Sequence, residues 1–435
     1  MTHPKVLLLA YAVSPQRGSE YSVAWNHITW MSKYCELTVL YGCAGTHMGD
    51  FEELADPVLR ESLPSVNFVP VPPPLLARLL NAVNRRGWLT YSFYLAYRVW
   101  QREAGRVARQ LAREQVYDLI HYVGPIGYRE PGTMWRMDLP YVWGPIGGAT
   151  HLPWMLARAL PLADRVRLGL RAVANWFQLR FSKRVRRALS RADLVLTATT
   201  ENQAIFRRVL GVESLYLPEN GVVGEVALNQ AKFDDLQRLK LVWIGSLEAR
   251  KALKILVDAM QRTQHAARFE VHVAGDGPLG TVLQKTVASA GLAAQFVWHG
   301  QVERQTVHHL LNDSHLHVIT SVSEANTTVV WEAMALGVPT LTIDHCGMHD
   351  TITDGAGLKV PIGQYDEVVA GFARHLDELA EHPERLRQMA QQVLADADRF
   401  HWKHRPAFWL KCYADTVARH GERGGAAPES RRWQQ

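Results

Sequence analysis

The sequence is poor in cysteine and has no long apolar run. Its four cysteines, Cys35, Cys43, Cys346 and Cys412, form no Cys-x-x-Cys pair and no cysteine–histidine spacing typical of a zinc site. This pattern argues against a disulfide framework and predicts reduced thiols in a cytosolic protein. No stretch approaches the roughly 18 apolar residues of a membrane span, and residues 6–13 are too short and lack the cleavage pattern of a secretory signal. We therefore expect a cytoplasmic protein.

The length and the charge distribution indicate two dissimilar halves. The 435 residues exceed the size at which one hydrophobic core keeps growing, so two domains are expected. With 47% apolar and 21% charged residues, the composition is that of a globular protein. The net charge of +6 is uneven, because residues 1–222 hold 26 Lys/Arg against 17 Asp/Glu and the remainder holds 22 against 25.

Two segments carry much of the basic excess. Residues 78–113 and 158–191 mix arginines with Trp, Tyr, Phe and Leu at helical spacing. One interpretation is solvated helices with an apolar face toward the core. Another is a surface that contacts an anionic membrane, with aromatic side chains at the level of the headgroups. Nucleic-acid binding is not expected, since no recognition motif accompanies the charge.

Continuous apolar strands alternate with helical segments along most of the chain. Such an order predicts an α/β protein with parallel sheets that are covered on both faces. The pattern restarts near residue 239, which predicts two doubly wound, Rossmann-like domains facing a central cleft. We expect the first domain over 1–222, the second over 223–402, and a C-terminal helix over 403–420 that packs back on the first. Residues 421–435 are polar and expected to be disordered.

The stretch SEANTTVVWEAMALGVP, residues 323–339, places Glu324 before a predicted helix and Glu332 inside it. Asn326 or Thr327 is suited to cap this helix, and the glycine and proline after Leu336 end it. Free N–H groups of the first helical turn then offer a site for phosphate. The alternative is that Glu324 belongs to a cap and Glu332 to a solvated face.

These residues stand among several further motifs. The segments GSLEARKAL, VAGDGP, WHGQVERQTVHHLL and SVSEANTTVVWEAMALGVPTLTID follow one another on the predicted strand ends and helices. Together they resemble the retaining, nucleotide-sugar-dependent glycosyltransferases of the GT-B fold, family 4 or group 1. The likeness extends over most of residues 239–415. It is looser in the first half, through SPQRGSEYSVAWN, DLIHYVG and PYVWGPIGG.

The resemblance implies roles for residues of the second half. Glu332 corresponds to the glutamate that holds the nucleotide ribose, and Glu324 to the one that grips hydroxyls of the donor sugar. Backbone amides of Asn326, Thr327 and Thr328 would meet the diphosphate. Lys251 matches the lysine that stabilises the charge of the departing nucleoside diphosphate.

One position departs from the family pattern. Ser246 stands where an arginine is usual, directly after the first glycine of GSLEARK. Arg250 could supply the missing guanidinium, or it could be a surface arginine that opens a helix. Gly275 belongs to a loop that would flank the donor, with a purely structural role as the alternative.

The first half contributes two further candidates. Gly18, just before a helix expected to open at Ser19, would allow the backbone to approach a ligand, or is required only by the turn. His121 resembles the family's strand-end histidine near the transferred sugar, or is a satisfied core histidine.

The resemblance implies transfer of a sugar from a UDP- or GDP-linked donor to a hydroxyl of a glycan or lipid-linked acceptor. Retention by front-face attack is expected, without a metal or another cofactor, in synthesis of a bacterial polysaccharide, lipopolysaccharide or lipid-linked oligosaccharide. Asp396 and Asp398 are interpreted as a solvated helix face and not as a metal site. The alternatives are another GT-B enzyme, such as a nucleotide-sugar epimerase or a sugar phosphorylase, and a non-catalytic nucleotide-sugar-binding protein. A dinucleotide oxidoreductase is disfavoured because no GxGxxG follows the first strand.

Overall fold

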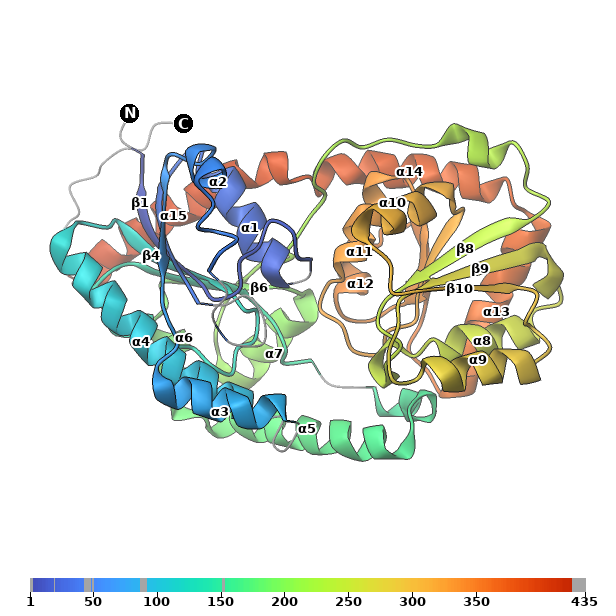
Figure 1. Cartoon of the computed structure of the whole chain (residues 1–435), viewed down its shortest axis with the longest axis horizontal. Helices are drawn as coiled ribbons and strands as arrows, with labels where there is room; N and C mark the ends of the chain where they lie inside the picture. Colours follow the sequence, from blue (N-terminus) through green and yellow to red (C-terminus); the bar gives the residue numbers. More distant parts are fainter. Residues whose placement is uncertain are drawn as a thin grey trace. The chain divides into compact units, whose positions relative to one another are not determined.

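The computed structural model describes residues 3–18, 20–42, 48, 51–86, 92–150 and 153–424. The chain divides into two units, each built on one sheet (Figure 1). Unit 1 is formed by the described residues of Met1–Ala149, Trp176–Asn220 and Trp402–Gln435. Unit 2 is formed by those of Thr150–Asn175 and Gly221–His401.

The sheet of unit 1 is parallel in every pair, with the order β3-β2-β1-β4-β5-β6-β7. Its strands are β1 (Lys5–Ala10), β2 (Glu36–Tyr41), β3 (Val66–Pro70), β4 (Leu119–Gly124), β5 (Tyr141–Ile146), β6 (Leu194–Thr197) and β7 (Leu215–Tyr216). The central strands β4, β5 and β6 are buried at every position, as expected for a parallel sheet with both faces covered.

Helices cover both faces of this sheet. They are α1 (Glu20–Met31), α2 (Pro57–Glu61), α3 (Leu75–Arg85), α4 (Ser92–Glu114), the short η1 (Met134–Arg136), α6 (Lys183–Arg191), α7 (Thr200–Leu210), η6 (Trp402–His404) and α15 (Arg405–Gly424). Their ends follow local sequence chemistry: the Thr199 side chain caps α7, and Gly211 ends it in the left-handed region with φ 66°. Helix α5 (Leu162–Phe181) is shared, because its residues 162–175 belong to unit 2 and 176–181 to unit 1.

Unit 2 repeats the design with the strand order β10-β9-β8-β11-β12-β13, again all parallel. Its strands are β8 (Leu239–Ile244), β9 (Phe269–Ala274), β10 (Phe296–Gly300), β11 (Leu316–Ile319), β12 (Thr340–Ile343) and β13 (Gly357–Val360). Its helical segments are η2 (Trp154–Ala159), η3 (Gln230–Phe233), η4 (Ala249–Lys251), α8 (Lys254–Arg262), η5 (Ala266–Arg268), α9 (Gly280–Ser289), α10 (Arg304–Asp313), α11 (Thr328–Ala335), α12 (Cys346–Thr351), α13 (Tyr365–Glu381) and α14 (Arg385–Arg399).

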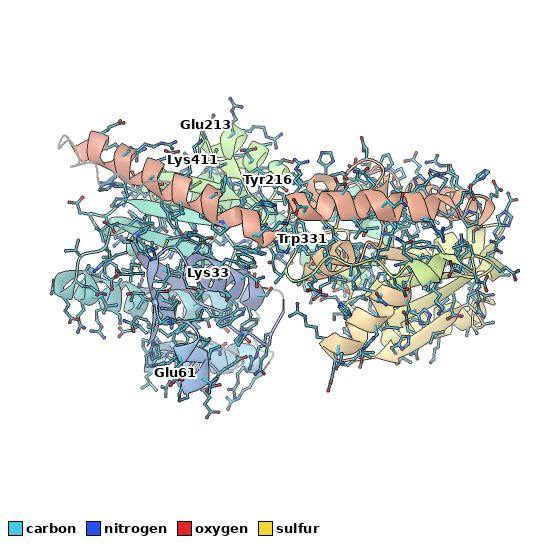
Figure 2. The ribbon with its side chains drawn as sticks, turned by 90° about the horizontal axis from the view of Figure 1, so that it is seen from above. Lys33, Glu61, Glu213, Tyr216, Trp331 and Lys411 are labelled. Carbon is cyan, nitrogen blue, oxygen red and sulfur yellow. The ribbon has the colours of Figure 1, made fainter. Side chains whose placement is uncertain are left out.

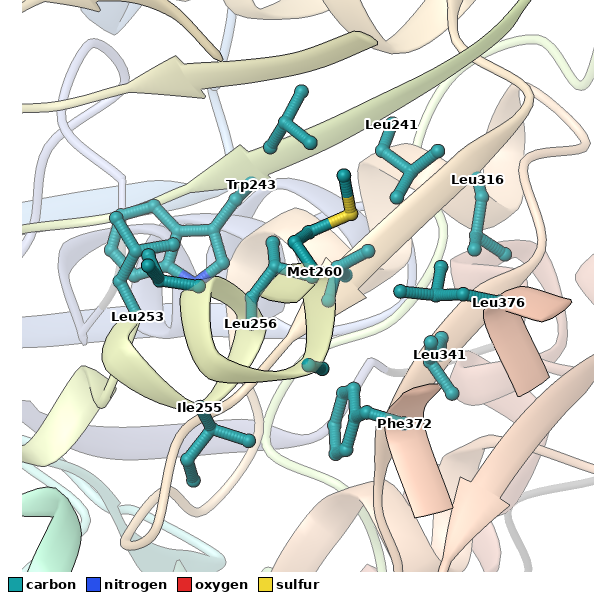
Figure 3. Close-up of a cluster of buried hydrophobic side chains, with 14 of the residues drawn as sticks. Leu241, Trp243, Leu253, Ile255, Leu256, Met260, Leu316, Leu341, Phe372 and Leu376 are labelled. Carbon is teal, nitrogen blue, oxygen red and sulfur yellow. The ribbon is translucent and has the colours of Figure 1, made fainter. Parts of the chain in front are cut away.

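The core of unit 2 fills the space between its sheet and helices α8 and α13 (Figure 3). Leu241 and Trp243 point from β8 toward Leu256 and Met260 of α8. Phe372 of α13 closes the cluster and is fully buried. Burial of large apolar side chains of this kind contributes about 1.5–3 kcal/mol each.

Residues 150–175 belong to unit 2, whereas the sequence-based division placed them in the first domain. The cause is apolar packing that the sequence pattern does not reveal. Leu156 of η2 and Leu160, which follows this segment, are buried in the core of unit 2. Arg158 forms an ion pair of 3.0 Å with Asp366 of α13.

The chain end breaks where the sequence indicates. Helix α14 ends at Arg399, η6 follows, and α15 begins at Arg405 and lies in unit 1. Figure 2 gives a second view, in which Lys411 lies on α15 and Trp331 on α11. The predictions for Ser19 and Cys43, and for the tail beyond residue 424, fall outside the described residues.

The other three cysteines, Cys35, Cys346 and Cys412, are buried, and none of these three is part of a disulfide. None of the helices in the described part of the chain has the length and apolar character needed to cross a membrane.

His121 lies in the middle of β4, where its side chain is 0% exposed. Its Nε2 donates to the Gly144 carbonyl (2.8 Å), and its Nδ1 accepts from the Tyr413 hydroxyl (2.9 Å) of α15. His27 Nε2 in turn donates to that hydroxyl (3.0 Å). Burial lowers the pKa of His121 from 6.5 to about 4, so the ring is neutral near pH 7, and a neutral ring that donates from Nε2 accepts at Nδ1.

A histidine whose pKa is lower in the folded than in the unfolded protein favours folding above its unfolded-state pKa. This contribution is lost as the pH falls toward the folded-state pKa. We therefore expect the free energy of unfolding to fall between pH 7.5 and pH 5, with a share of about 2 kcal/mol from His121. Urea unfolding at both pH values measures this loss. The variant His121→Gln is less stable throughout, but its stability depends less on pH. Equal pH dependence in both proteins would contradict a buried, neutral His121.

Candidate functional site

The strand order of unit 2 reverses between β8 and β11, which emerge side by side at the carboxyl edge of the sheet. In open parallel sheets, ligands bind in the crevice that forms at such a point. The loop after β8 carries Arg250 and Lys251 on η4, and the loop after β11 carries Glu324 and leads into α11. The sequence-based candidates of the second half therefore cluster at one edge of one sheet.

Backbone hydrogen bonds join these two loops. The Val322 N–H donates to the Arg250 carbonyl (2.9 Å), and the Thr320 hydroxyl donates to the Lys251 carbonyl (2.7 Å). The indole N–H of Trp243 donates to the same hydroxyl (3.0 Å). Because Thr320 and Trp243 are buried, the backbone that carries the two cations is held in place by hydrogen bonds to the interior of unit 2.

The side chains above this anchor form a charged cluster. Lys251 Nζ lies 3.1 Å from Glu324 Oε1, and Arg250 Nη1 lies 2.5 Å from Glu324 Oε2. Arg250 also pairs with Glu248 at 2.8 Å. The side chains of Lys251 and Glu324 are only 13% and 15% exposed, so this pair is better shielded from solvent than an ordinary surface ion pair.

Helix α11 begins beside this loop. Thr327 is its N-cap and makes no side-chain capping bond to the helix, while the Val330 N–H donates to the Thr327 carbonyl (3.2 Å). The positive end of the helix dipole lies at this N-terminus and favours an anion. Gly347 of α12 backs the preceding turn, since a Cβ there would lie 1.8 Å from the Ala325 carbonyl oxygen. The helix ends at Ala335, one residue before the predicted end, with Leu336 as C-cap and Gly337 in the left-handed region at φ 61°.

Glu332 lies within α11, whereas Glu324 precedes this helix, and Glu332 pairs with a different cation. Arg304, the first residue of α10, places Nη2 at 2.9 Å and Nε at 3.1 Å from Glu332 Oε1. Burial raises the pKa of Glu332, and the Arg304 guanidinium opposes that shift. Glu332 is therefore a partly buried carboxylate held in place by an arginine.

The loops after β8 and β9 lie backbone to backbone. The Leu247 N–H donates to the Asp276 carbonyl (3.0 Å), and a Cβ on Gly275 would lie 1.9 Å from the Gly245 carbonyl oxygen. Gly275 also has φ +137°, so the position requires glycine for backbone reasons alone. Ser246 is exposed on this pair of loops. Backbone geometry and close packing are thus sufficient to explain why a glycine stands at position 275.

The two candidates of the first half lie in unit 1. The burial and the two filled ring nitrogens of His121 favour the core alternative and leave no nitrogen for a substrate, so we withdraw the catalytic role. Gly18 is exposed in the loop before α1, and no atom of the described residues outside its chain neighbours lies within 4 Å of the place where a Cβ would stand. The described part of unit 1 therefore gives no packing reason for a glycine here.

Sequence reasoning missed Arg304 and Glu248, the partners of Glu332 and Arg250. Arg304 lies in the motif WHGQVERQTV, directly after a strand end, and this was the signal for it. Asp396 of the Asp-x-Asp pair lies on α14, where its carboxylate accepts a hydrogen bond from Thr353.

Comparison with known proteins relates the region that holds the unit 2 candidates to a protein family. Residues 228–393 match the family model described as Glycosyl transferases group 1. This part of the chain belongs to the group 1 glycosyl transferases. All candidate residues of unit 2 lie inside the group 1 region.

Curated relatives align with only part of the chain. The D-inositol 3-phosphate glycosyltransferase of Nocardia farcinica is 30% identical over 199 residues, which are 42% of this chain and 42% of that protein. The putative glycosyltransferase EpsD of Bacillus subtilis is 27% identical over 162 residues, 37% of this chain and 41% of its own. The chain thus spans about two fifths of the length of these two relatives.

Solved structures resemble the whole chain in fold. The Anabaena protein Alr3699/HepE, solved in complex with UDP, has a TM-score of 0.61 at 16% identity and covers 94% of this chain and 99% of its own. The lipopolysaccharide outer core galactosyltransferase WaaB in its apo form has a TM-score of 0.55 at 15% identity, with 90% and 98% covered. The expected α/β fold class of GT-B architecture is confirmed.

Proposed function

We propose that this chain is a retaining glycosyltransferase that moves a sugar from a UDP- or GDP-linked donor to a hydroxyl of a glycan or lipid-linked acceptor. The observation that carries the proposal is the cluster of Lys251, Arg250 and Glu324 at the β8/β11 edge, beside the first turn of α11. Support comes from the names of the relatives, which are glycosyltransferases, and from the UDP and UDP-glucose complexes of HepE.

The cluster supplies what departure of a nucleoside diphosphate needs. Lys251 and the N–H groups around Asn326, Thr327 and Thr328 bind the diphosphate and stabilise its growing charge. Arg250, held at 2.5 Å from Glu324, supplies the guanidinium that Ser246 lacks. The scheme uses no metal ion, because these groups provide the positive charge.

The two glutamates bind different parts of the donor in this proposal. Both hydrogen bonds from Arg304 go to Glu332 Oε1, and within the described structure Oε2 takes part in no hydrogen bond. Oε2 then accepts from the ribose hydroxyls. Glu324 accepts from hydroxyls of the sugar, while Lys251 turns its remaining N–H groups to the phosphates. Departing phosphate helps to deprotonate the acceptor on the same face, which retains the anomeric configuration.

The proposal as a whole is tested with a panel of UDP- and GDP-sugars. The thermal shift of the full chain identifies the donor, and release of nucleotide in the presence of glycan and lipid-linked acceptors measures turnover. Binding without any turnover would indicate a nucleotide-sugar-binding protein. Conversion of the donor without transfer, or a product formed from a sugar phosphate, would indicate an epimerase or a phosphorylase.

Lys251→Ala is expected to reduce turnover of the nucleotide sugar by at least a hundredfold. A charged group that hydrogen-bonds to the leaving group stabilises the transition state by about 3 kcal/mol. The matched control is Lys254→Ala on α8, whose ammonium pairs with Asp258. This control keeps turnover near that of the wild type. Steady-state rates with the best donor of the panel provide the measurement, and equal losses in both variants would contradict the role of Lys251.

Glu332→Ala and Glu324→Ala are expected to separate binding from transfer. Loss of Glu332 mainly weakens donor binding, about tenfold in KM, because it removes hydrogen bonds made equally in ground state and transition state. Loss of Glu324 mainly lowers kcat, because it also releases Arg250 and Lys251 from their fixed positions. Glu303→Ala, an exposed neighbour of Arg304, serves as control. If neither glutamate variant changes kcat or KM, the assignment fails.

The proposed acceptor is carried on a membrane, in synthesis of a bacterial polysaccharide, lipopolysaccharide or lipid-linked oligosaccharide. The supporting feature is the long helix α5 (Figure 1). Its exposed side chains include an apolar stripe. The members of the stripe recur at helical spacing and are between 53% and 73% exposed: Leu162, Val166, Leu170, Val173, Phe177 and Phe181. Arg167 and Arg171 are exposed at the border of the stripe, as in helices that lie on anionic lipid. Peripheral binding at the inner face of the cytoplasmic membrane follows.

Leu170→Asp and Phe177→Asp are each expected to weaken binding to vesicles of phosphatidylglycerol and phosphatidylcholine about tenfold, because each removes a large apolar side chain from the lipid. Val282→Asp on α9, which replaces an apolar side chain that is 59% exposed, is the control. Cosedimentation at low and at high salt measures the effect. Wild-type binding that disappears at high salt, or equal binding of all variants, would show that the stripe does not insert.

A further inference from the structure

Unit 1 contains a cavity of about 290 Å³, and none of the residues that line it belongs to the proposed donor site. Its walls come from α4, from the loop between β4 and β5, and from the start of α6. Five arginines line it: Arg98, Arg102, Arg109, Arg136 and Arg184. A single carboxylate, that of Glu130, stands among them.

Helix α4 forms one wall of this cavity, and the spacing of its residues places three of the arginines on that wall. Arg98, Arg102 and Arg109 share one face of α4 with Gly105, at spacings of three, four and seven residues. A Cβ on Gly105 would lie 2.0 Å from the hydroxyl oxygen of Thr133. The glycine therefore lets the loop close against the middle of the arginine row, which places the row inside a concavity.

Glu130 fixes two of the arginines. Its side chain is 7% exposed, and it accepts from Arg98 Nη2 (2.7 Å), Arg98 Nε (3.2 Å) and Arg184 Nη2 (2.8 Å). Both carboxylate oxygens are thus occupied by guanidinium groups. One buried carboxylate positions two guanidiniums and neutralises one of the two charges.

The other three arginines lack such a partner. Over the described ranges, Arg102, Arg109 and Arg136 form no ion pair, and Arg136 stacks on the Trp135 ring at 4.9 Å. Arg106, on another face of α4, shows the ordinary surface arrangement, because it pairs with Glu103 at 2.7 Å. Converging like charges repel one another, and they are stabilised when an anion binds among them.

Gln101 forms part of the floor of the cavity and holds it in place. It is 1% exposed and donates its amide to the hydroxyls of Tyr97 and Tyr122. Its Oε1 is buried against Gly132, because a Cβ on that glycine would lie 2.4 Å from this oxygen. The contacts to a ligand therefore come from the arginines above this floor.

We infer that this cavity binds a phosphate group carried by a small hydroxylated molecule, such as a sugar phosphate or the headgroup of an anionic lipid. Guanidinium groups recognise phosphate through paired, charge-assisted hydrogen bonds, and Arg102, Arg109 and Arg136 supply them. The volume, near the lower limit of small-molecule sites, suits a single sugar ring with its phosphate. The inference rests on unit 1 alone and holds whether or not unit 2 turns over a nucleotide sugar.

The test is a calorimetric titration of the full chain with a hexose 6-phosphate, with the unphosphorylated hexose, and with phosphatidic acid vesicles, all at constant ionic strength. It is carried out in the Lys251→Ala background, so that phosphate does not bind through that lysine. We expect the hexose phosphate or the vesicles to bind and the free hexose not to bind. Arg109→Gln and Arg136→Gln each weaken binding about tenfold, and Arg106→Gln leaves it unchanged.

The outcomes separate the sources of the phosphate. Binding of the hexose phosphate assigns a soluble ligand, and binding of vesicles alone, lost in the same two variants, assigns a lipid headgroup. All substituted arginines are exposed, and unchanged melting temperatures without ligand confirm that the variants fold. The inference is overturned if no phosphate-bearing probe binds, or if Arg106→Gln weakens binding as much as Arg109→Gln.

Discussion

The hydrogen bonds between the loop after β8 and the loop after β11 are the constraint on which the candidate site depends. Parallel strands end without a hairpin, so the loops at their carboxyl edge must find hydrogen-bond partners of their own. Here the Val322 N–H and the Thr320 hydroxyl bond the carbonyls of Arg250 and Lys251. The bonds fix the backbone of both cations at the point where the strand order reverses. A site of opposite charges then forms between loops that are distant in sequence.

Glu324 holds the side chains of the two cations in place. A single carboxylate within 3.1 Å of two cations keeps both side chains ordered at the start of α11. Ion pairs of this kind add little to stability once desolvation is counted, so their value lies in geometry. Two cations in place before a polyanion arrives lose less conformational freedom when it binds. Glu332 and Arg304 repeat the device with one arginine, farther along the helix.

The fold was largely predictable from sequence, and the candidate site only in part. Buried parallel strands are continuous apolar runs, and capping chemistry marks the ends of α11, so both could be located from local pattern. Long-range partners leave no such signal. The burial of His121 under Tyr413 depends on α15, and the Arg304–Glu332 pair joins two helices. The packing of Leu156 into unit 2 likewise requires the tertiary structure.

The basic excess of the first half shows why composition alone names no partner. In the structure this charge is used in different ways: Arg98 and Arg184 share the carboxylate of Glu130, Arg109 faces a cavity, and Arg171 borders an apolar stripe. Each use has a different consequence. A paired arginine fixes local geometry, a group of arginines in a concavity selects a compact anion, and arginines at the border of a helix face favour an extended anionic surface. The same count of positive charges is compatible with all three. Only the position of the carboxylates decides which arginines remain for a ligand.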